Sequence, residues 1–282
     1  MRVLTFDIEE WFHILDNPST KYEHQWLSFE SRIHHNLSRI FAILERKNVR
    51  ATFFCVGWIA DKYPELITEI AERGYEVGSH TQMHQLVYEQ KPEEFQEDLH
   101  RSISTLEDLT GKKVRSFRAP GFSITEQNKW AFEILVKNGI EIDCSIFPGA
   151  RAHGGFPTFN DGVPSIIRYN GIELKEFPIS YSRVLGKPLF YSGGGYFRLC
   201  PYQVIKNLTS KSDYVMSYLH PRDFDPNQPM VPDLPISRKI KCYVGLNTTE
   251  RKLDRWLSDF SFTDLEHANA ETDWSKAPVY EL

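Results

Sequence analysis

Residues 51–80 read ATFFCVGWIADKYPELITEIAERGYEVGSH and contain one complete strand–helix–strand unit. Ala51–Val56 is apolar throughout and rich in β-forming side chains, which is typical of a strand buried on both faces of a sheet. Pro64–Arg73 has the spacing of a helix, and Gly74 ends it. Tyr75–Ser79 is the second strand. Two strands that are joined through a helix are predicted to pair in parallel.

The same alternation continues on both sides of this unit. The pattern predicts strands at Val3–Asp7, Ser116–Arg118 and Ile140–Ser145, and helices at Ser31–Lys47, Pro92–Leu109 and Glu126–Asn138. Repeated strand–helix units predict an α/β fold with a parallel sheet, either closed into a barrel or open with helices on both faces. The G-x-G-x-x-G and Walker A patterns do not occur in the sequence, which argues against a nucleotide-binding sheet.

After Pro148 the pattern changes to short β runs separated by glycine and proline, as in hairpins and loops laid over a main body. Ile172–Phe177 is one such run. Gly193–Phe197 is expected to be a flexible loop or a tight turn. Tyr202–Asn207 could form a short helix, and Tyr214–His220 returns as a strand.

The end of the chain is predicted to be helical. Asn247-Thr248-Thr249-Glu250 resembles a capping box that opens a helix to Phe260. Because no linker is visible, we expect a single domain over residues 1–282. Its core motifs lie in residues 1–225, and residues 226–282 form a C-terminal extension packed on that core.

The composition is that of an ordinary globular protein. The chain has 282 residues, of which 41% are hydrophobic and 25% are charged. Its net charge of −5 comes without a basic stripe, so we expect no nucleic-acid partner. No apolar run reaches the roughly 18 residues that a membrane span needs. The aromatic content of 13% suits either a carbohydrate groove or core packing.

The start of the chain and its cysteines predict a cytoplasmic protein. Met1–Asp7 passes directly into a strand pattern and lacks the features of a signal peptide. The four cysteines are scattered and form no C-x-x-C pair, and Cys55 and Cys144 fall in apolar strand runs. Buried free thiols of this kind indicate a reducing compartment.

Polar side chains end several of the predicted strands. In a barrel of β-α units, catalytic groups lie at the carboxyl ends of the strands. Burying an ionisable side chain is costly unless it pairs with another group or binds an ion. Core packing is therefore a poor explanation for ionisable residues at the ends of strands. Five predicted strands end in an ionisable or metal-ligating residue, namely Asp7, His80, Arg118, Asp143 and His220.

His80 and His84 are the first candidate metal ligands. A separation of four places both imidazoles on one face of a helical turn, a geometry that can chelate a cation. Two histidines at this spacing are more often solvated or capping residues. Their position directly after a predicted strand favours a metal site.

The acidic cluster Asp7-Ile8-Glu9-Glu10 offers a third ligand. Asp7 and Glu9 project to the same face if the strand continues, and a cation would relieve the repulsion between them. We assign Glu9 as the ligand and Asp7 as the general base. Glu10 is the rival ligand, and an acidic surface turn is the alternative without function. Two imidazoles and one carboxylate suit zinc with an open position for water, although the same set can hold ferrous iron.

Five short motifs give the sequence a closer resemblance. Thr5-Phe6-Asp7, His80-Thr81-x-x-His84, Arg118-Ala119-Pro120-Gly121, Asp143-x-Ser145 and Leu219-His220 occur in the order of the polysaccharide deacetylase family, which carries the NodB homology domain (carbohydrate esterase family four). The Asp-Ile-Glu-Glu-Trp-Phe start, the Gly-Gly-Gly-Tyr-Phe-Arg segment and the Asn-Thr-Thr-Glu-Arg-Lys segment resemble the branch associated with exopolysaccharide gene clusters.

The resemblance implies a fold and a first group of roles. The family's fold is a distorted (β/α) barrel, here expected to have about seven strands, a β-hairpin-rich insertion and a C-terminal helical extension. Asp7 resembles the general base. His80 and His84 resemble metal ligands, and Arg118 resembles the residue that orients the base.

The remaining motif residues are expected around the reacting group. Gly121 occupies the place whose backbone N–H helps to hold the oxyanion. His220 resembles the general acid, and Asp143 tunes the environment of Arg118 or His220. Leu219 would flank the pocket for the acetyl methyl group.

One departure from the family pattern concerns the metal. Many members have a second aspartate directly after the first, and this chain has Ile8 at that place. The next acidic group is Glu9, which we therefore interpret as the ligand. Trp11 is expected to line the substrate groove, with core packing as the alternative. Arg222 and Asp223, directly after His220, could contact substrate or cap the loop.

The expected function is that of a hydrolase that removes an N-acetyl or other N-acyl group from an amino sugar. The substrate would be an oligo- or polysaccharide, or a lipid- or nucleotide-linked precursor for exopolysaccharide or lipopolysaccharide biosynthesis. We expect one divalent ion, zinc first, with iron, cobalt or nickel as alternatives. A non-catalytic carbohydrate-binding protein with the same fold is the competing hypothesis. A homo-oligomer is compatible with the sequence.

Overall fold

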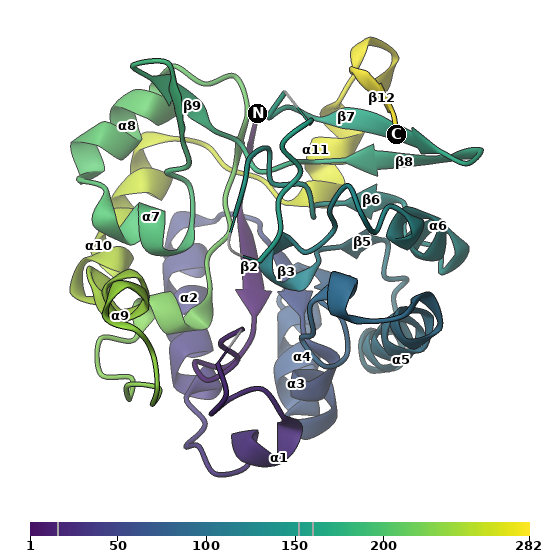
Figure 1. Ribbon diagram of the computed structural model, residues 1–282. Helices are drawn as coiled ribbons and strands as arrows, with labels where there is room; N and C mark the ends of the chain where they lie inside the picture. Colours follow the sequence, from purple (N-terminus) through teal and green to yellow (C-terminus); the bar gives the residue numbers. More distant parts are fainter. Residues whose placement is uncertain (16, 152, 160) are drawn as a thin grey trace. The chain divides into compact units, whose positions relative to one another are not determined.

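The chain folds into two units, and each is assembled from segments that lie far apart in the sequence. The computed structural model describes residues 1–15, 17–151, 153–159 and 161–282. The first unit contains Met1–Ala51 and Tyr181–Thr263, and the second contains Thr52–Ser180 and Asp264–Leu282. Figure 1 labels most of the helices and many of the strands of both units.

A mainly parallel sheet forms the centre of the second unit. Its strands are β3 (Thr52–Cys55), β4 (Glu76–Ser79), β5 (Ser116–Phe117), β6 (Ile142–Asp143), β7 (Ser165–Tyr169), β8 (Ile172–Glu176) and β12 (Val279–Glu281). They lie in the order β12-β7-β8-β6-β5-β4-β3. β3 pairs with β4 in parallel, from Thr52 opposite Glu76 to Cys55 opposite Ser79. The strand–helix–strand prediction for residues 51–80 is therefore confirmed.

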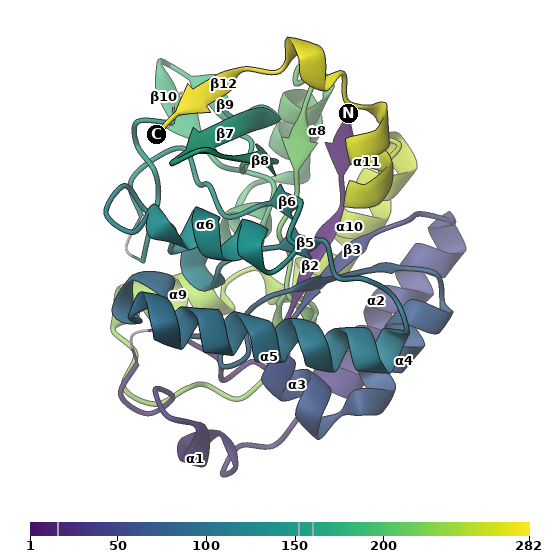
Figure 2. The ribbon, with the colours of Figure 1, turned by 90° about the vertical axis from the view of Figure 1, so that its right-hand side faces the viewer.

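Helices connect these strands and cover the sheet. They are α3 (Gly57–Lys62), α4 (Pro64–Glu72), α5 (Pro92–Thr110), α6 (Trp130–Lys137) and α11 (Leu265–Glu271), with short 3₁₀ turns η1 (Val87–Glu89), η2 (Pro120–Phe122) and η4 (Trp274–Lys276). α5 and α6 lie side by side (Figure 2). α6 begins four positions later than predicted, because the Asn128 side chain accepts the Thr125 N–H (2.8 Å) and closes a turn instead.

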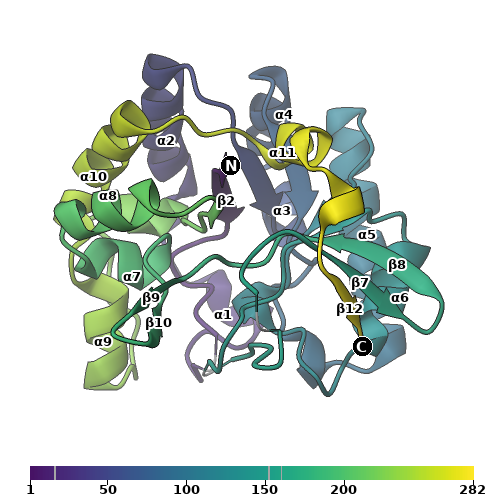
Figure 3. The ribbon, with the colours of Figure 1, turned by 90° about the horizontal axis from the view of Figure 1, so that it is seen from above.

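β7 and β8 form the expected hairpin after the strand–helix repeats. They pair antiparallel, with Tyr169 opposite Ile172. Asn170 and Gly171 connect them with φ angles of 46° and 83°, as a two-residue type I′ turn requires. β12 runs parallel to β7 (Figure 3), so the C-terminus adds a strand to the sheet as well as the expected helices.

The first unit is richer in helices. Its helices are α1 (Glu23–Trp26), α2 (Ile33–Lys47), α7 (Gly194–Leu199), α8 (Tyr202–Ser210), the 3₁₀ turn η3 (Pro221–Phe224), α9 (Ile236–Tyr243) and α10 (Leu246–Asp259). Its strands are β1 (Arg2–Val3), β2 (Thr5–Ile8), β9 (Ser182–Val184), β10 (Lys187–Leu189) and β11 (Val215–Met216). β1 pairs with β11 in parallel.

Two helices of the first unit confirm the predicted patterns. α2 begins two residues after the predicted start and ends at the predicted Lys47, and it buries Leu37, Ile40 and Leu44 on one face. α10 packs against α2 (Figure 1), and it begins and ends within a residue of the predicted bounds.

The predicted loop at Gly193–Phe197 is wrong, because helix α7 begins at Gly194. Glycine is a poor helix former in isolation. Here the close approach of Gly193 to Tyr218 requires the absence of a side chain, since a Cβ would lie 2.2 Å from the Tyr218 carbonyl oxygen. Tertiary packing therefore outweighs the local preference.

The expected α/β class with a mainly parallel sheet is confirmed. None of the helices in the described part of the chain is both long and apolar enough to cross a membrane.

Candidate active site

In the second unit, three predicted site residues lie at the carboxyl ends of neighbouring parallel strands. His80 follows β4, Arg118 follows β5 and Asp143 ends β6. β4 pairs with β5, and β5 pairs with β6. The carboxyl ends of parallel strands meet at one edge of a sheet, and this is where α/β enzymes place their chemistry. The sequence prediction of these strand ends is therefore confirmed.

The two histidine rings lie next to each other, with their centroids 5.2 Å apart. They are brought together by a non-helical loop, so the predicted helical turn is wrong. Thr81 and His84 have φ angles of 66° and 51°, a region that is uncommon for residues other than glycine. Such backbone strain is often found at functional sites, where surrounding contacts hold it in place.

Two contacts fix the histidine loop. His80 Nδ1–H donates to the Arg118 carbonyl oxygen at 2.7 Å, so the proton on Nδ1 directs Nε2 toward any bound metal. Asp98, on α5, accepts the backbone N–H groups of Gln82 (2.7 Å) and Met83 (3.1 Å). Asp98 was missed from the sequence, since its helical position is indistinguishable from that of a surface carboxylate.

The Arg118 side chain is completely buried. Its Nε–H donates to the Cys144 carbonyl oxygen at 3.3 Å, and its guanidinium lies over the Phe54 ring, 4.4 Å from the centroid. A cation over an aromatic face is stabilised by the ring quadrupole. Packing therefore holds this arginine rigidly at the end of β5.

Asp143 faces a second buried carboxyl group. It lies opposite Glu176 in the β6–β8 register, and its Oδ1 accepts the Ser145 hydroxyl at 2.5 Å. Burial raises the pKa of Asp143 to about 6. Burial, together with the charge of Asp143, raises the pKa of Glu176 well above its ordinary value. Two carboxyl groups this close share a proton. Glu176 was missed, although it lies within the predicted β run Ile172–Phe177.

In the first unit, Asp7 lies in β2 and is almost completely buried. Its backbone N–H donates to the Leu219 carbonyl oxygen at 2.8 Å, so the two predicted motifs lie side by side. The next residue, His220, places Nε2 3.7 Å from Asp7 Oδ2. The fold thus brings the proposed base and the proposed acid together from positions 213 residues apart in the sequence.

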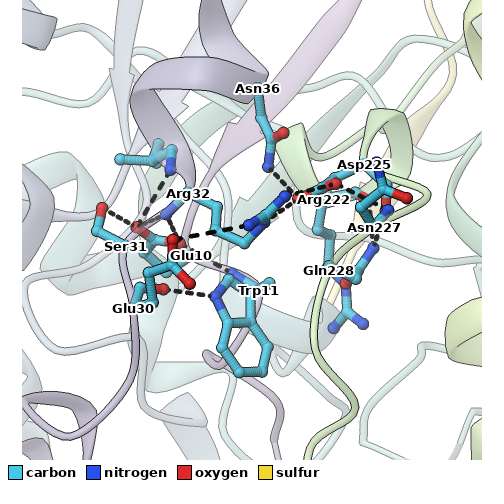
Figure 4. A network of polar contacts seen from close by, with 11 residues as sticks. Glu10, Trp11, Glu30, Ser31, Arg32, Asn36, Arg222, Asp225, Asn227 and Gln228 are labelled. Carbon is cyan, nitrogen blue, oxygen red and sulfur yellow. Dashed lines mark hydrogen bonds and ion pairs between the residues drawn. The ribbon is translucent and has the colours of Figure 1, made fainter.

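Glu10 caps helix α2. Its carboxylate accepts the Ser31 hydroxyl and the backbone N–H groups of Arg32 (3.0 Å) and Ile33 (3.2 Å), as Figure 4 shows in part. The first N–H groups of a helix need such acceptors, and the helix dipole favours a negative charge there. Because these hydrogen bonds occupy the Glu10 carboxylate, they favour Glu9 over Glu10 as the metal ligand.

Replacing Glu10 by Ala should lower the free energy of unfolding by about 1–2 kcal/mol, because α2 loses its cap. Urea unfolding would measure this change, and elemental analysis should find the metal content of the variant unchanged. Glu9→Ala is the matched variant. It should lose the metal ion while its free energy of unfolding stays close to that of the unmodified protein. Loss of metal from Glu10→Ala with the ion retained in Glu9→Ala would contradict the assignment.

His220 has a charged partner three residues ahead. His220 Nδ1 lies 3.0 Å from Asp223 Oδ2, and Asp223 Oδ1 lies 2.8 Å from Arg198 Nε. Burial disfavours the imidazolium, but the hydrogen bond and charge of Asp223 outweigh it and raise the pKa of His220 to about 9. Burial opposes ionisation of Asp223 too, but Arg198 and His220 lower its pKa to about 2.

These pKa shifts predict how stability changes with pH. The raised pKa of His220 stabilises the fold below its ordinary value of 6.5, and this contribution is lost as pH rises through about 9. The lowered pKa of Asp223 stabilises the fold above its ordinary value of 3.8, and this contribution is lost toward about 2. Both contributions are complete between about pH 4 and 6.5.

Asp223→Asn should therefore lower the free energy of unfolding by about 3 kcal/mol near pH 5.5, and by less near pH 9.5. Urea unfolding of the variant and the unmodified protein at both pH values measures the difference. A difference that does not change with pH would show that the ion pair does not control stability.

The remaining predicted residues fall as follows. Gly121 lies in η2 with a φ of 62°. Leu219 is fully buried. Trp11 is also buried, and its Nε1–H donates to the Glu30 carbonyl oxygen at 2.8 Å, which favours the packing alternative over a groove (Figure 4). His80 and His84 of the second unit are buried side chains of metal-ligand type, and so is Glu9 of the first unit.

Comparisons with known proteins identify two sequence regions. Residues 17–141 match the family model for polysaccharide deacetylase. Residues 144–270 match a model described as a domain of unknown function, DUF3473.

Curated relatives match parts of the chain. A peptidoglycan-N-acetylglucosamine deacetylase from Bacillus cereus is 33% identical over 96 residues, which cover 34% of this chain and 35% of the relative. A chitooligosaccharide deacetylase from Azorhizobium caulinodans is 28% identical over 124 residues, covering 43% of this chain and 54% of the relative. The matches thus span about a third to a half of these relatives.

Solved structures match nearly the whole chain. A proposed polysaccharide deacetylase from Mycobacterium smegmatis aligns with a TM-score of 0.67 at 18% identity, covering 100% of this chain and 92% of the other. A CE4 family pseudoenzyme from Bacillus anthracis aligns with a TM-score of 0.50 at 14% identity, covering 95% of this chain and 64% of the other. At these identities the likeness shows the fold alone, and it confirms the expected NodB-like class.

Proposed function

We propose that this chain, whose residues 17–141 match the polysaccharide deacetylase family model, is a metal-dependent hydrolase that removes an N-acetyl or other N-acyl group from an amino sugar. The observation that carries the proposal is the pairing of Asp7 with His220, whose imidazole is held by Asp223. A buried carboxylate beside a protonated imidazole supplies a base and an acid for the two proton transfers of amide hydrolysis.

The metal would be held by His80, His84 and Glu9. Two imidazoles and one carboxylate suit zinc, and iron, cobalt or nickel are alternatives. When bound, the ion would lower the pKa of a water molecule and polarise the acyl oxygen. The donor chemistry fits such an ion, since all three side chains are buried and of ligand type. We propose that residues 1–282 form a single catalytic domain.

Asp7 would take a proton as water attacks the acyl carbon. His220, held as an imidazolium by Asp223, would then donate its proton to the departing amine nitrogen. By family resemblance, Arg118 would orient the base and Asp143 would tune its surroundings. The Gly121 N–H would stabilise the oxyanion, and Leu219 would flank the acyl methyl group.

The substrate would be an amino sugar in an oligo- or polysaccharide, or in a lipid- or nucleotide-linked precursor of exopolysaccharide or lipopolysaccharide. The names of the curated relatives support an N-acetylated sugar polymer. We also propose a cytoplasmic location, which is supported by four free cysteines and no disulfide among the described residues.

The proposal is tested by measuring acetate release from N-acetylated chitooligosaccharides and peptidoglycan fragments by the zinc-loaded protein. We expect release that stops when the ion is removed with a chelator and returns when zinc is added. Sugar binding without acetate release from either substrate would support the competing hypothesis of a non-catalytic carbohydrate-binding protein.

A further inference from the structure

Gly193–Arg198 is a distinctive segment of the DUF3473 region, and the proposed function leaves it without a role. We propose that Arg198 is a positioning residue for catalysis, and that the three glycines exist to bring it into place. Arg198 holds Asp223, and Asp223 holds His220. This inference rests on the proposed function, in which His220 is the general acid.

The three side chains form a continuous series, in which Arg198 and Asp223 are buried and His220 is partly exposed. Arg198 Nε lies 2.8 Å from Asp223 Oδ1, and both side chains are less than 5% exposed. The other carboxylate oxygen, Asp223 Oδ2, lies 3.0 Å from His220 Nδ1 and also accepts the His220 backbone N–H at 3.0 Å. The opposite ring nitrogen, Nε2, faces Asp7 at 3.7 Å. Asp223 thus sets the orientation of the imidazole through Nδ1, the ring nitrogen opposite the one that faces Asp7.

Arg198 is itself anchored on its far side. Its Nη1 donates to the carbonyl oxygens of Cys242 (3.0 Å) and Val244 (2.9 Å), and its Nη2 donates to that of Lys241 (2.6 Å). These carbonyl groups belong to the carboxyl end of α9, where backbone acceptors lack partners within the helix. The guanidinium therefore donates hydrogen bonds to the α9 carbonyl groups through Nη1 and Nη2 while Nε lies against Asp223 as an ion pair. A lysine ammonium could not reproduce this geometry.

The glycines allow α7 to pack directly beneath His220. The Gly194 N–H donates to the Tyr218 carbonyl oxygen at 2.9 Å, and Gly194 has a φ of 49°. A Cβ on Gly193 would lie 2.2 Å from that same oxygen, and one on Gly195 would lie 2.9 Å from the Lys241 carbonyl oxygen. Any larger residue at Gly193 would push α7, and Arg198 with it, away from Asp223.

The charge of Arg198 has a further consequence during turnover. When His220 gives up its proton, Asp223 loses the positive charge of the imidazolium. A buried carboxylate without a counter-charge tends to take up a proton or change its contacts. Arg198 keeps Asp223 ionised through both protonation states of His220, so the imidazole keeps its orientation and can be reprotonated for the next cycle.

The test combines a double-mutant cycle, measured by enzyme kinetics, with a proton NMR measurement that does not depend on activity. Arg198→Met should lower kcat about 10- to 100-fold with little change in KM, as expected for a residue that acts through another. Asp223→Asn should produce a similar loss. In the double variant the losses should not multiply, because both substitutions break the same support. Full multiplication of the two losses would overturn the proposal.

The second measurement follows the proton between His220 Nδ1 and Asp223 by proton NMR, with the resonance assigned through its loss in His220→Gln. We expect this downfield resonance to disappear in Arg198→Met and to weaken in Arg198→Lys, which serves if the first variant folds poorly. Its persistence at full intensity in a folded Arg198 variant would overturn the proposal. Absence of acetate release from the unmodified protein would instead count against the proposed function.

Arg32→Met is the matched control. Arg32 forms an ion pair with Asp225, two residues beyond Asp223, and Figure 4 shows this pair. The substitution removes a similar arginine–aspartate pair in the same unit. In the described part of that unit the Arg32 side chain pairs with Asp225 and Glu30, and not with Asp223 or His220. We expect lower stability with kcat and the resonance preserved. Equal losses in both arginine variants would reduce the role of Arg198 to general stability and overturn the proposal.

Discussion

Asp7→Asn should lower kcat by about 10²–10⁴ while the protein keeps its metal ion. The amide has nearly the same size as the carboxylate and still accepts hydrogen bonds, so the surrounding fold should persist. It cannot take up a proton at neutral pH, however. Because Asp7 is almost completely buried beside His220, bulk water should replace it poorly as the base.

Two measurements separate this effect from misfolding. Elemental analysis should find equal metal in Asp7→Asn and the unmodified protein, and their unfolding midpoints should be similar. Asp225→Asn is a suitable control, because Asp225 is another buried carboxylate of the same unit, paired with Arg32. That variant should lose stability and retain kcat. Activity of Asp7→Asn close to that of the unmodified protein would rule out Asp7 as the base.

His80→Ala should abolish both metal binding and turnover. Removing a residue that hydrogen-bonds to a metal ligand typically weakens metal binding about 10- to 100-fold. Removing a ligand itself should weaken metal binding further. The Nδ1–H contact of His80 with the Arg118 carbonyl oxygen would disappear as well, so a small loss of stability is expected.

Elemental analysis of the purified variant is the direct measurement. His100→Ala is the matched control, since His100 is an exposed residue of α5, and it should retain metal and activity. Equal metal content in His80→Ala and the unmodified protein would contradict the ligand assignment. It would also remove the main support for a metal-dependent reaction.

Local patterns were sufficient to predict most elements of the fold. The run at residues 51–56 is apolar on both faces because β3 is buried between neighbours, and the pattern of α2 marks the face that it buries. The strand ends at His80, Arg118 and Asp143 followed from the same alternation. These features depend on residues close together in the chain, which is why the order of residues alone reveals them.

Other features depended on contacts between distant segments. Glu10 could be separated from Glu9 only once Ser31 and the start of α2 were seen to meet its carboxylate. The spacing of the two histidines suggested a helical turn, but Asp98 holds their loop in another conformation.

The residue order by itself thus determined the strand–helix repeat and the strand-end polar groups, because burial and helical period are local properties. Tertiary structure decided which carboxylate caps α2, which carboxylate holds His220, and why α7 forms over Gly194–Leu199. Asp223 meets Arg198 across 25 positions of sequence, and Asp143 meets Glu176 across 33. Hydrogen bonds and ion pairs act over a few ångströms, so packing must first bring such groups together before their chemistry can be assigned.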